Sequence, residues 1–288
     1  MNTIGIIGTG FVGTAVMEGM RHAFEIWAYD KFKGVHGILG GKPFSVNTAD
    51  GFEQVAIKAE LIFVCVPTPM KEDGSCDTSI VEGVVAELAR VAKRPTTVVI
   101  KSTVPPGTTA RLDILYDNLY VCFNPEFLTE RNAIEDFKNQ DRIIIGGPHE
   151  GTAVLKQVYE MAYPNVQVTK TSSTIAEMVK YATNCFLATK VAIANEIEQV
   201  CNRLQIDYDK VVEYATKDKR LGTSHWSVPG PDGKKGFGGS CFPKDLNGFL
   251  ALAESLNVDC HTLAGAWQTN LNVRPDKDWE QLKGRAVV

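Results

Sequence analysis

The chain has 288 residues, of which 44% are hydrophobic and 22% are charged, and its formal net charge is −4. This length favours two domains, the balance is typical of a globular protein, and the charge argues against a nucleic-acid partner. The seven cysteines are scattered without a CxxC pair. This argues against a disulfide framework or a metal site and favours a reducing compartment.

The N-terminal run MNTIGIIGTGFVG lacks the basic segment and the cleavage site of a secretory signal. No apolar run is long enough to span a membrane. We therefore expect a cytoplasmic location and no membrane partner.

The first half of the chain alternates apolar runs with helical stretches, which predicts an α/β fold with a Rossmann-like, doubly wound parallel sheet. We expect this domain to cover residues 1–170. Helices are predicted at Gly13–His22 and Ser79–Ala92. The predicted strands are Thr3–Ile7, Ile26–Tyr29, Leu61–Val66, Thr97–Ile100, Leu119–Phe123 and Arg142–Ile145.

The second half, residues 171–288, is predicted to form an all-helical domain. Thr174–Leu204 contains neither glycine nor proline, which predicts one long helix. A loop rich in glycine and proline covers residues 222–239. Shorter helices are predicted at Tyr208–Ala215, Lys244–Leu256 and His261–Asn272.

The motif G-x-G-x-x-G follows the first predicted strand, as Gly8, Gly10 and Gly13. Such glycines allow a tight turn and the close approach of a pyrophosphate to a helix N-terminus. Asp30 ends the next strand, where a carboxylate binds ribose hydroxyls and repels a 2′-phosphate. The motif therefore predicts NAD binding, against the alternative of a plain glycine turn with a capping aspartate.

Polar residues follow several later strands, where open α/β sheets bind ligands. Thr68, Ser102 and Thr103 lie in the proline-rich loops VPTP and KSTVPPG, although plain turn chemistry would explain either loop alone. Glu126 in NPEFL is a possible general base or a surface acid. Lys180 and Asn184 are one helical turn apart, and they could stabilise an oxyanion or form a solvated stripe.

The segment GFGGSCFPKD places Cys241 after a glycine turn and just before a predicted helix. A helix N-terminus favours the thiolate, and Lys244 and Asp245 follow at once. A reactive thiol and a carbonyl substrate give a thiohemiacetal and then a thioester, which water hydrolyses. The alternative is a small buried cysteine, and the neighbouring glycines and charges argue against it.

Together these motifs are specific, and they occur over nearly the whole chain: GTGFVG, VPTP, KSTVPPGTT, NPEFL, AEMVKYATNCFLATK, DKRLG and GFGGSCFPKD. In them the chain resembles the UDP-glucose/GDP-mannose 6-dehydrogenase family, most closely its UDP-glucose branch. The resemblance implies NAD-dependent, four-electron oxidation of the C6 alcohol of a nucleotide sugar, such as UDP-glucose to UDP-glucuronate, for polysaccharide biosynthesis.

Three alternatives stay open. The substrate could be another nucleotide sugar, GDP-mannose or a UDP-N-acetylhexosamine. The enzyme could be a two-electron β-hydroxyacid dehydrogenase, although such enzymes need no cysteine. The chain could also be a non-catalytic NAD-binding scaffold, which would have no need of the five polar side chains at positions 126, 180, 184, 241 and 245.

The resemblance also implies roles for individual residues. The catalytic residues would be Cys241, Lys180, Asn184, Asp245, Glu126 and Thr103. The NAD contacts would be Gly8, Gly10, Phe11, Val12, Gly13, Asp30, Pro67, Thr68, Thr103 and Lys244. The sugar-nucleotide contacts would be Phe127, Leu128, Glu130, Lys180, Asn184, Arg220, Phe237 and Gly238, with Arg220 reaching the substrate of a neighbouring subunit.

The chain departs from the family pattern in two places. Family members continue into a third, UDP-binding domain, whereas this sequence stops at Val288. The loop at residues 223–235 is also longer, and we hypothesise that His225 and Trp226 replace lost nucleotide contacts by stacking on the base. A homodimer is expected, with Trp267 and Leu271 at its interface.

Overall fold

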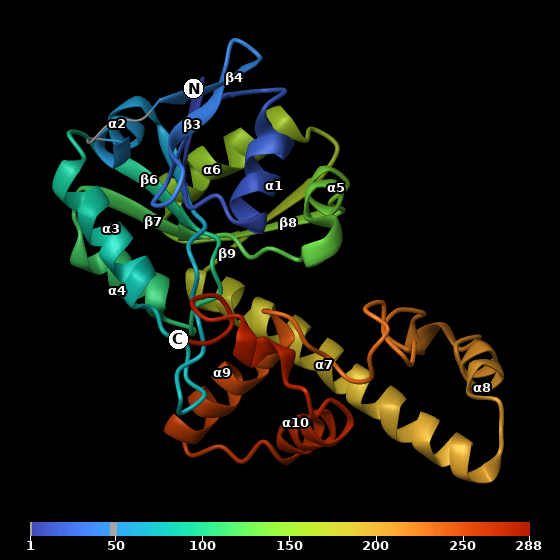
Figure 1. The fold of residues 1–288 in the computed structure, drawn as a ribbon. Helices are drawn as coiled ribbons and strands as arrows, with labels where there is room; N and C mark the ends of the chain where they lie inside the picture. Colours follow the sequence, from blue (N-terminus) through green and yellow to red (C-terminus); the bar gives the residue numbers. More distant parts are fainter. Residues whose placement is uncertain (1, 47–50) are drawn as a thin grey trace. The chain divides into compact units, whose positions relative to one another are not determined.

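The computed structural model describes residues 2–46 and 51–288 and divides the chain into two compact units (Figure 1). Unit 1 takes the chain up to Thr68 and from Thr78 to Lys180, and unit 2 comprises Pro69–Asp77 and Tyr181–Val288. The compact units thus divide inside the long helix. The division of the sequence into domains at residue 170 stays a prediction.

Unit 1 is built on a nine-stranded sheet with the order β4-β3-β2-β1-β5-β6-β7-β8-β9. Neighbouring strands are parallel from β2 through β1, β5 and β6 to β7, and again from β8 to β9. The strands are β1 (Thr3–Ile7), β2 (Glu25–Asp30), β3 (Gly34–Leu39), β4 (Lys42–Val46), β5 (Leu61–Val64), β6 (Thr96–Ile100), β7 (Leu119–Phe123), β8 (Arg142–Gly146) and β9 (Gln167–Thr171).

The predicted α/β class and Rossmann-like, doubly wound fold are confirmed, and the sheet is mostly parallel. Strands β3 and β4 form an antiparallel extension at one edge, and β8 runs antiparallel to β7. The predicted strand at Leu61–Val66 ends at Val64. Strands β3, β4 and β9 were not expected, because their sequences are short, polar or interrupted by glycine.

Helices cover both faces of the sheet in unit 1 (Figure 1). On one face lie α1 (Phe11–Met20), α5 (Ala133–Lys138) and α6 (His149–Ala162), and on the other α2 (Gly51–Lys58), α3 (Ser79–Val91) and α4 (Thr108–Leu115). Each face has its own hydrophobic core, so the central strands are buried on both sides. This is why β5 reads as the unbroken apolar run LIFV.

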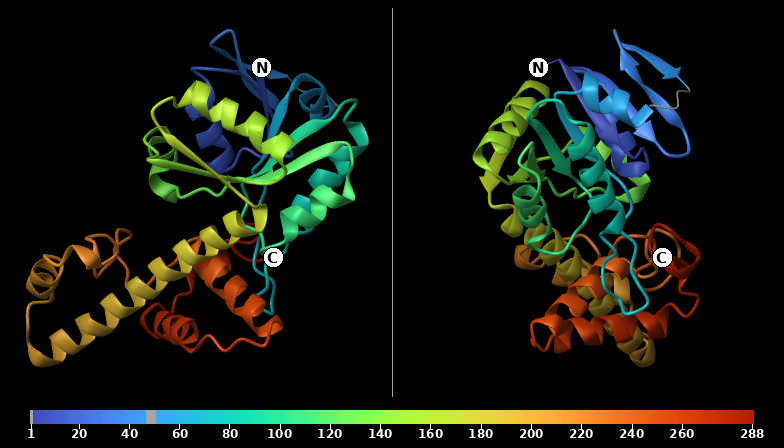
Figure 2. Two further views of the ribbon diagram at one scale, coloured as in Figure 1. Left: turned by 180° about the vertical axis from the view of Figure 1, so that it is seen from behind. Right: turned by 90° about the vertical axis from the view of Figure 1, so that its left-hand side faces the viewer.

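Unit 2 consists mainly of helices, as the sequence predicts. Helices α9 and α10 lie beside the residues of α7 that belong to this unit, and α8 follows the end of α7 (Figure 2). Tyr181, Cys185, Phe237 and Leu246 form the centre of its core. The helices are α7 (Ser173–Leu204), α8 (Tyr208–Ala215), α9 (Phe242–Ser255) and α10 (His261–Val273).

Two helices begin earlier than the sequence predicts. Helix α1 starts at Phe11 with Gly10 as its N-cap, and α9 starts at Phe242 with Cys241 as its N-cap. Proline is favoured in the first turn of a helix, where its missing N–H costs nothing, and Pro243 occupies that place in α9. No helix in the described part of the chain has the length and apolarity needed to cross a membrane.

Candidate active site

The glycine motif forms the turn between β1 and α1. Gly8 has a φ of +89°, and a Cβ at Gly13 would lie 2.0 Å from the carbonyl oxygen of Gly8, so neither position accepts a side chain. A Cβ at Gly10 would meet nothing within 4 Å. The turn therefore packs tightly at two glycines and leaves open space over the third, at the N-terminus of a helix. This arrangement fits a bound pyrophosphate.

Asp30 ends β2 and faces this turn. Its carboxylate accepts hydrogen bonds from the Thr9 N–H at 2.8 Å, the Thr9 hydroxyl at 3.1 Å and the Phe32 N–H at 3.0 Å. Burial opposes ionisation of Asp30, but these hydrogen bonds outweigh it and hold the pKa of the carboxyl below its ordinary value. Asp30 is thus an ionised acceptor beside the glycine turn, which fits the ribose of a dinucleotide.

The loops after β5 and β6 lie close to one another, because the Ser102 hydroxyl donates to the Val66 carbonyl at 2.6 Å. Thr68 and Thr103 are buried, whereas Pro67 is exposed. Phe11 and Val12, in the first turn of α1, are half-buried. The cofactor contacts assigned to these residues stay predictions.

Glu126 follows β7 and forms a buried ion pair with Lys180 of α7. The Lys180 ammonium donates to the Glu126 carboxylate at 2.8 Å and to the Glu126 carbonyl at 2.6 Å. Burial acts to raise the pKa of Glu126, but Lys180 and the Leu128 N–H lower it below its ordinary value. The surface-acid reading of Glu126 is therefore wrong, and so is the solvated-stripe reading of Lys180.

The residues that follow Glu126 in the chain differ in their contacts and in their exposure to solvent. The Lys180 ammonium lies 5.9 Å from the centre of the Phe127 ring, and the Arg142 guanidinium lies 4.5 Å from the same centre. Phe127 and Leu128 are half-buried, and Glu130 is exposed. Their predicted contacts with the sugar nucleotide stay predictions.

Sequence reasoning missed a buried lysine beside this pair. The Lys101 ammonium donates to the Asn124 side-chain oxygen at 2.8 Å, and the Tyr159 hydroxyl donates to the same oxygen at 2.5 Å. The Asn124 amide nitrogen donates to the Ile144 carbonyl at 2.7 Å. Burial lowers the pKa of Lys101 to about 8. A lysine directly after an apolar strand was the available signal.

Glu177 has a structural role, although it shares a helix with Lys180. Its carboxylate accepts the Gly107 N–H at 2.6 Å and the Thr109 N–H at 2.8 Å, at the start of α4. Burial raises the pKa of Glu177 above its ordinary value. The carboxylate thus satisfies backbone donors that a helix N-terminus leaves open.

Cys241 is the N-cap of α9 in unit 2 and is half-buried. Its carbonyl accepts the Asp245 N–H at 2.9 Å, and its sulfur lies 3.8 Å from the Ser240 hydroxyl. Four other cysteines, Cys65, Cys122, Cys185 and Cys201, are buried. A thiol at a helix N-terminus is favoured as a thiolate, because the positive end of the helix dipole lies there.

Asp245, in the first turn of α9, joins two other polar residues. One carboxylate oxygen accepts the Asn184 amide at 2.6 Å, and the other accepts the Lys244 ammonium at 2.5 Å. Burial opposes the charge of Lys244, but Asp245 and the thiols of Cys241 and Cys76 raise its pKa above the ordinary value. Lys244, predicted as an NAD contact, is therefore a permanent cation whose field reaches the thiol.

The remaining predicted substrate residues of unit 2 differ in their surroundings. Phe237 is buried, with its ring against Phe242 and Trp267, and Gly238 is half-buried. Arg220 is exposed and pairs with Asp218 at 2.5 Å. Trp226 donates to the Gly222 carbonyl and has the Lys190 ammonium 5.2 Å from its ring centre. The roles given to these residues stay predictions.

Comparison with known proteins assigns both parts of the chain to one dehydrogenase family. Residues 41–163 match the NAD binding domain of the UDP-glucose/GDP-mannose dehydrogenase family, and residues 174–272 match its central domain. A UDP-glucose 6-dehydrogenase of Bacillus subtilis is 34% identical over 98% of this chain and 69% of its own length. Other UDP-glucose 6-dehydrogenases, from Rickettsia typhi and Pseudomonas aeruginosa, are matched over about half of their length.

Solved structures of dehydrogenases have a similar fold. A UDP-glucose dehydrogenase from Pyrobaculum islandicum has a TM-score of 0.83 and 30% identity, covering 98% of this chain and 71% of its own. A 3-hydroxyisobutyrate dehydrogenase from Mycobacterium tuberculosis has a TM-score of 0.74 over 96% of this chain and 95% of its own, but only 15% identity, and so shares the fold alone. The glycine turn, the nicotinamide-binding fold and the matched domains identify a dehydrogenase, and the chain belongs to the UDP-glucose/GDP-mannose dehydrogenase family.

Proposed function

We propose that the chain catalyses the NAD-dependent, four-electron oxidation of the C6 alcohol of a nucleotide sugar, UDP-glucose first, to the uronate. The observation that carries this proposal is the position of Cys241 at the N-terminus of α9, beside the linked side chains of Lys244, Asp245 and Asn184. A two-electron dehydrogenase needs no such nucleophile, so a reactive thiol favours oxidation to the acid.

The reaction would proceed through a covalent bond to Cys241. Bound NAD supplies the acceptor for each hydride that leaves C6. After the first oxidation the Cys241 sulfur attacks the aldehyde carbon and forms a thiohemiacetal. Loss of a second hydride and of the hydroxyl proton leaves a thioester. Water then attacks the thioester carbon, the carbon–sulfur bond breaks, and the acid and the thiol are released.

Other side chains would hold charge and water during these steps. We assign the stabilisation of the oxyanion to Lys180 and Asn184, because the Lys180 ammonium and the Asn184 amide are hydrogen-bond donors on the same helix. Glu126 is the proposed base for hydrolysis, since it is held ionised, and Thr103 would orient the water. Asp245 would orient Asn184 through their hydrogen bond.

NAD rather than NADP is the proposed cofactor. Asp30 is ionised and already accepts hydrogen bonds at the glycine turn, so a 2′-phosphate would meet a negative charge. Gly8, Gly10 and Gly13 would admit the pyrophosphate, and Thr68 and Pro67 would line the same site. The reducing environment of the cytoplasm would suit a reaction that depends on a reduced thiol.

A homodimer is proposed on the basis of α7. Phe186, Ile193 and Val200 are exposed at seven-residue intervals, with 71%, 44% and 58% of their surfaces exposed, so they form one apolar stripe. The same stripe on a second copy would bury it. Trp267 packs against Phe237 and Trp279 of its own unit, which makes α7 the stronger interface. Sedimentation of Phe186→Glu would test this.

The test of the activity is the amount of NADH formed from a limiting, known amount of UDP-glucose with excess NAD. Two NADH per sugar would establish oxidation to the acid. One NADH per sugar would contradict the covalent mechanism. If UDP-glucose gives none, GDP-mannose and UDP-N-acetylhexosamines are assayed in the same way, and failure with all of them would overturn the proposal in favour of an NAD-binding scaffold.

A further inference from the structure

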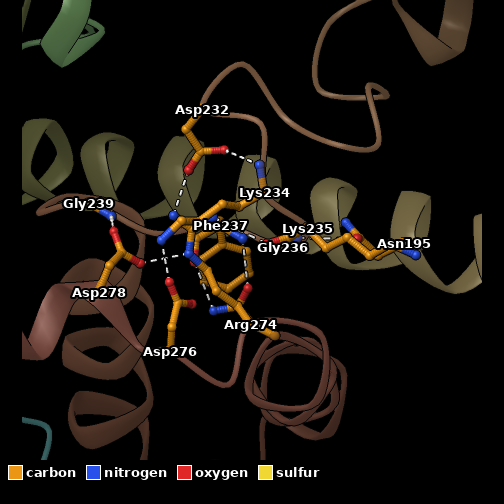
Figure 3. A network of polar contacts seen from close by, with 11 residues as sticks. Asn195, Asp232, Lys234, Lys235, Gly236, Phe237, Gly239, Arg274, Asp276 and Asp278 are labelled. Atoms are coloured by element: carbon orange, nitrogen blue, oxygen red, sulfur yellow. Dashed lines mark hydrogen bonds and ion pairs between the residues drawn. The ribbon is translucent and has the colours of Figure 1, made fainter.

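The glycine segment that precedes Cys241 is held through its backbone by buried side chains (Figure 3). The Gly236 N–H donates to Asn195 at 3.2 Å, and the Phe237 N–H donates to Asn270 at 2.7 Å. Asn270 also donates to the Phe237 carbonyl at 2.9 Å. Asn195 and Asn270 are both buried. The segment is therefore fixed from α7 and α10.

Asp278 extends this support to within two residues of the thiol. One of its carboxylate oxygens accepts the Gly239 N–H at 3.1 Å, and the other accepts the Arg274 guanidinium at 2.6 Å. Arg274 is buried, and it also donates to Asp232 at 2.5 Å and to the Lys235 carbonyl at 3.2 Å. A planar guanidinium suits several acceptors in fixed directions.

The glycines allow these side chains to approach the backbone. A Cβ at Gly238 would lie 2.3 Å from an Asp278 oxygen and 2.4 Å from an Arg274 nitrogen, and a Cβ at Gly236 would lie 2.4 Å from the Asn270 oxygen. Gly236 also has a φ of +69°, which favours glycine. The glycine pattern before Cys241 is thus explained by contacts within the protein.

We propose that Arg274 and Asp278 are positioning residues that keep Cys241 at the N-cap of α9. Asp278 bridges the guanidinium and the Gly239 N–H, and Ser240 alone separates Gly239 from the nucleophile. Without this bridge the chain before α9 can move, and the thiol is no longer held at the N-terminus of α9, an environment that favours a thiolate. The proposal rests on the proposed role of Cys241 in catalysis.

The test measures the reactivity of the thiol in the folded resting enzyme. Wild-type protein, Arg274→Lys and Asp278→Asn are treated with iodoacetamide at neutral and at alkaline pH, and tryptic cleavage after Lys235 and Lys244 isolates a peptide whose only cysteine is Cys241. Asp276→Asn is the matched control for Asp278→Asn, since Asp276 pairs with Lys234. Arg203→Lys, at an exposed position of α7, is the control for Arg274→Lys.

We expect alkylation of Cys241 to slow roughly tenfold at neutral pH in Arg274→Lys and Asp278→Asn, and to recover at alkaline pH. Both controls should react as the wild-type does. With substrate, kcat should fall while KM for NAD stays unchanged. Equal alkylation rates in all folded variants would overturn the proposal. Alkylation needs neither NAD nor sugar, so it decides this point even if no nucleotide sugar is oxidised.

Discussion

The Glu126 carboxylate and the Lys180 ammonium lie 2.8 Å apart, and their side chains are only 6% and 3% exposed. Burying either charge alone is costly, and the pair compensates for much of that cost. The Glu126 carbonyl accepts a second bond from the same ammonium, which fixes the segment after β7 to the start of α7.

Removal of the Lys180 charge should destabilise the protein. In Lys180→Met the Glu126 carboxylate would stay buried without its cation, so the free energy of unfolding should fall by about 3 to 5 kcal/mol. Chemical denaturation measures this change. The double variant Lys180→Met/Glu126→Leu should recover most of the loss, and equal stability of the single and double variants would contradict this account.

Acid should weaken the same pair. The folded-state pKa of Glu126 lies below its ordinary value of 4.5, so the unfolded chain binds the proton more tightly. The contribution of ionised Glu126 to the stability of the fold is therefore fully present above about pH 4.5. It is lost as the pH falls through the folded-state pKa of Glu126. Denaturation midpoints measured down this range should fall less steeply for Glu126→Gln than for the wild-type, and parallel curves would refute the assignment.

Alkaline pH should relieve the cost of burying Lys101. Its folded pKa of about 8 lies below the ordinary value of 10.5, so between these values the unfolded chain binds more protons than the folded one. The stability contributed by Lys101 therefore rises with pH across this window and is flat below it. In Lys101→Met this rise should disappear when denaturation midpoints are compared with the wild-type. Lys58→Met, on α2, is the control.

Asp30 should determine the choice of cofactor. In Asp30→Asn the loss of a charged acceptor should raise KM for NAD roughly tenfold. It should also reduce the preference of the enzyme for NAD over NADP. Initial rates with both cofactors at saturating sugar would measure this. Asp73→Asn, which alters an exposed turn at Ser75, should leave both values unchanged. An unaltered NAD/NADP ratio in Asp30→Asn would count against the assigned role.

Cys241 should be indispensable for formation of the acid. A serine cannot form the thioester, so NADH production by Cys241→Ser should fall roughly 1000-fold or more. Cys260→Ser, another half-buried thiol at the start of a helix, is the matched control and should keep full activity. Substantial turnover in Cys241→Ser would exclude the covalent route.

The sequence predicted most elements whose patterns are strong and local. The glycine turn, the apolar strands β1, β5, β6 and β7, and the start of a helix near Cys241 all follow from short stretches of residues. Strand β9, with the sequence QVTKT, was not predicted because it is largely polar and partly exposed at the sheet edge.

The partners of the polar residues could not be predicted. Lys180 and Asn184 are one turn apart on α7, yet one bonds Glu126 and the other bonds Asp245. Each partner lies more than 50 residues away in the sequence, at 54 and 61 positions. Spacing along a helix identifies neighbouring side chains, but the fold decides which distant carboxylate each one meets. For the same reason, the partners of Lys101 and Arg274 could not be predicted from the sequence.

Asn124 shows how finely one position can distinguish chemical groups. Lys101 and Tyr159 both donate to its side-chain oxygen, so its nitrogen must face the Ile144 carbonyl. Aspartate has the same shape but would place a second oxygen against that carbonyl, where two acceptors repel. An exchange of NH₂ for oxygen would thus break the contact between β8 and the residue that follows β7, while leaving the volume of the core unchanged.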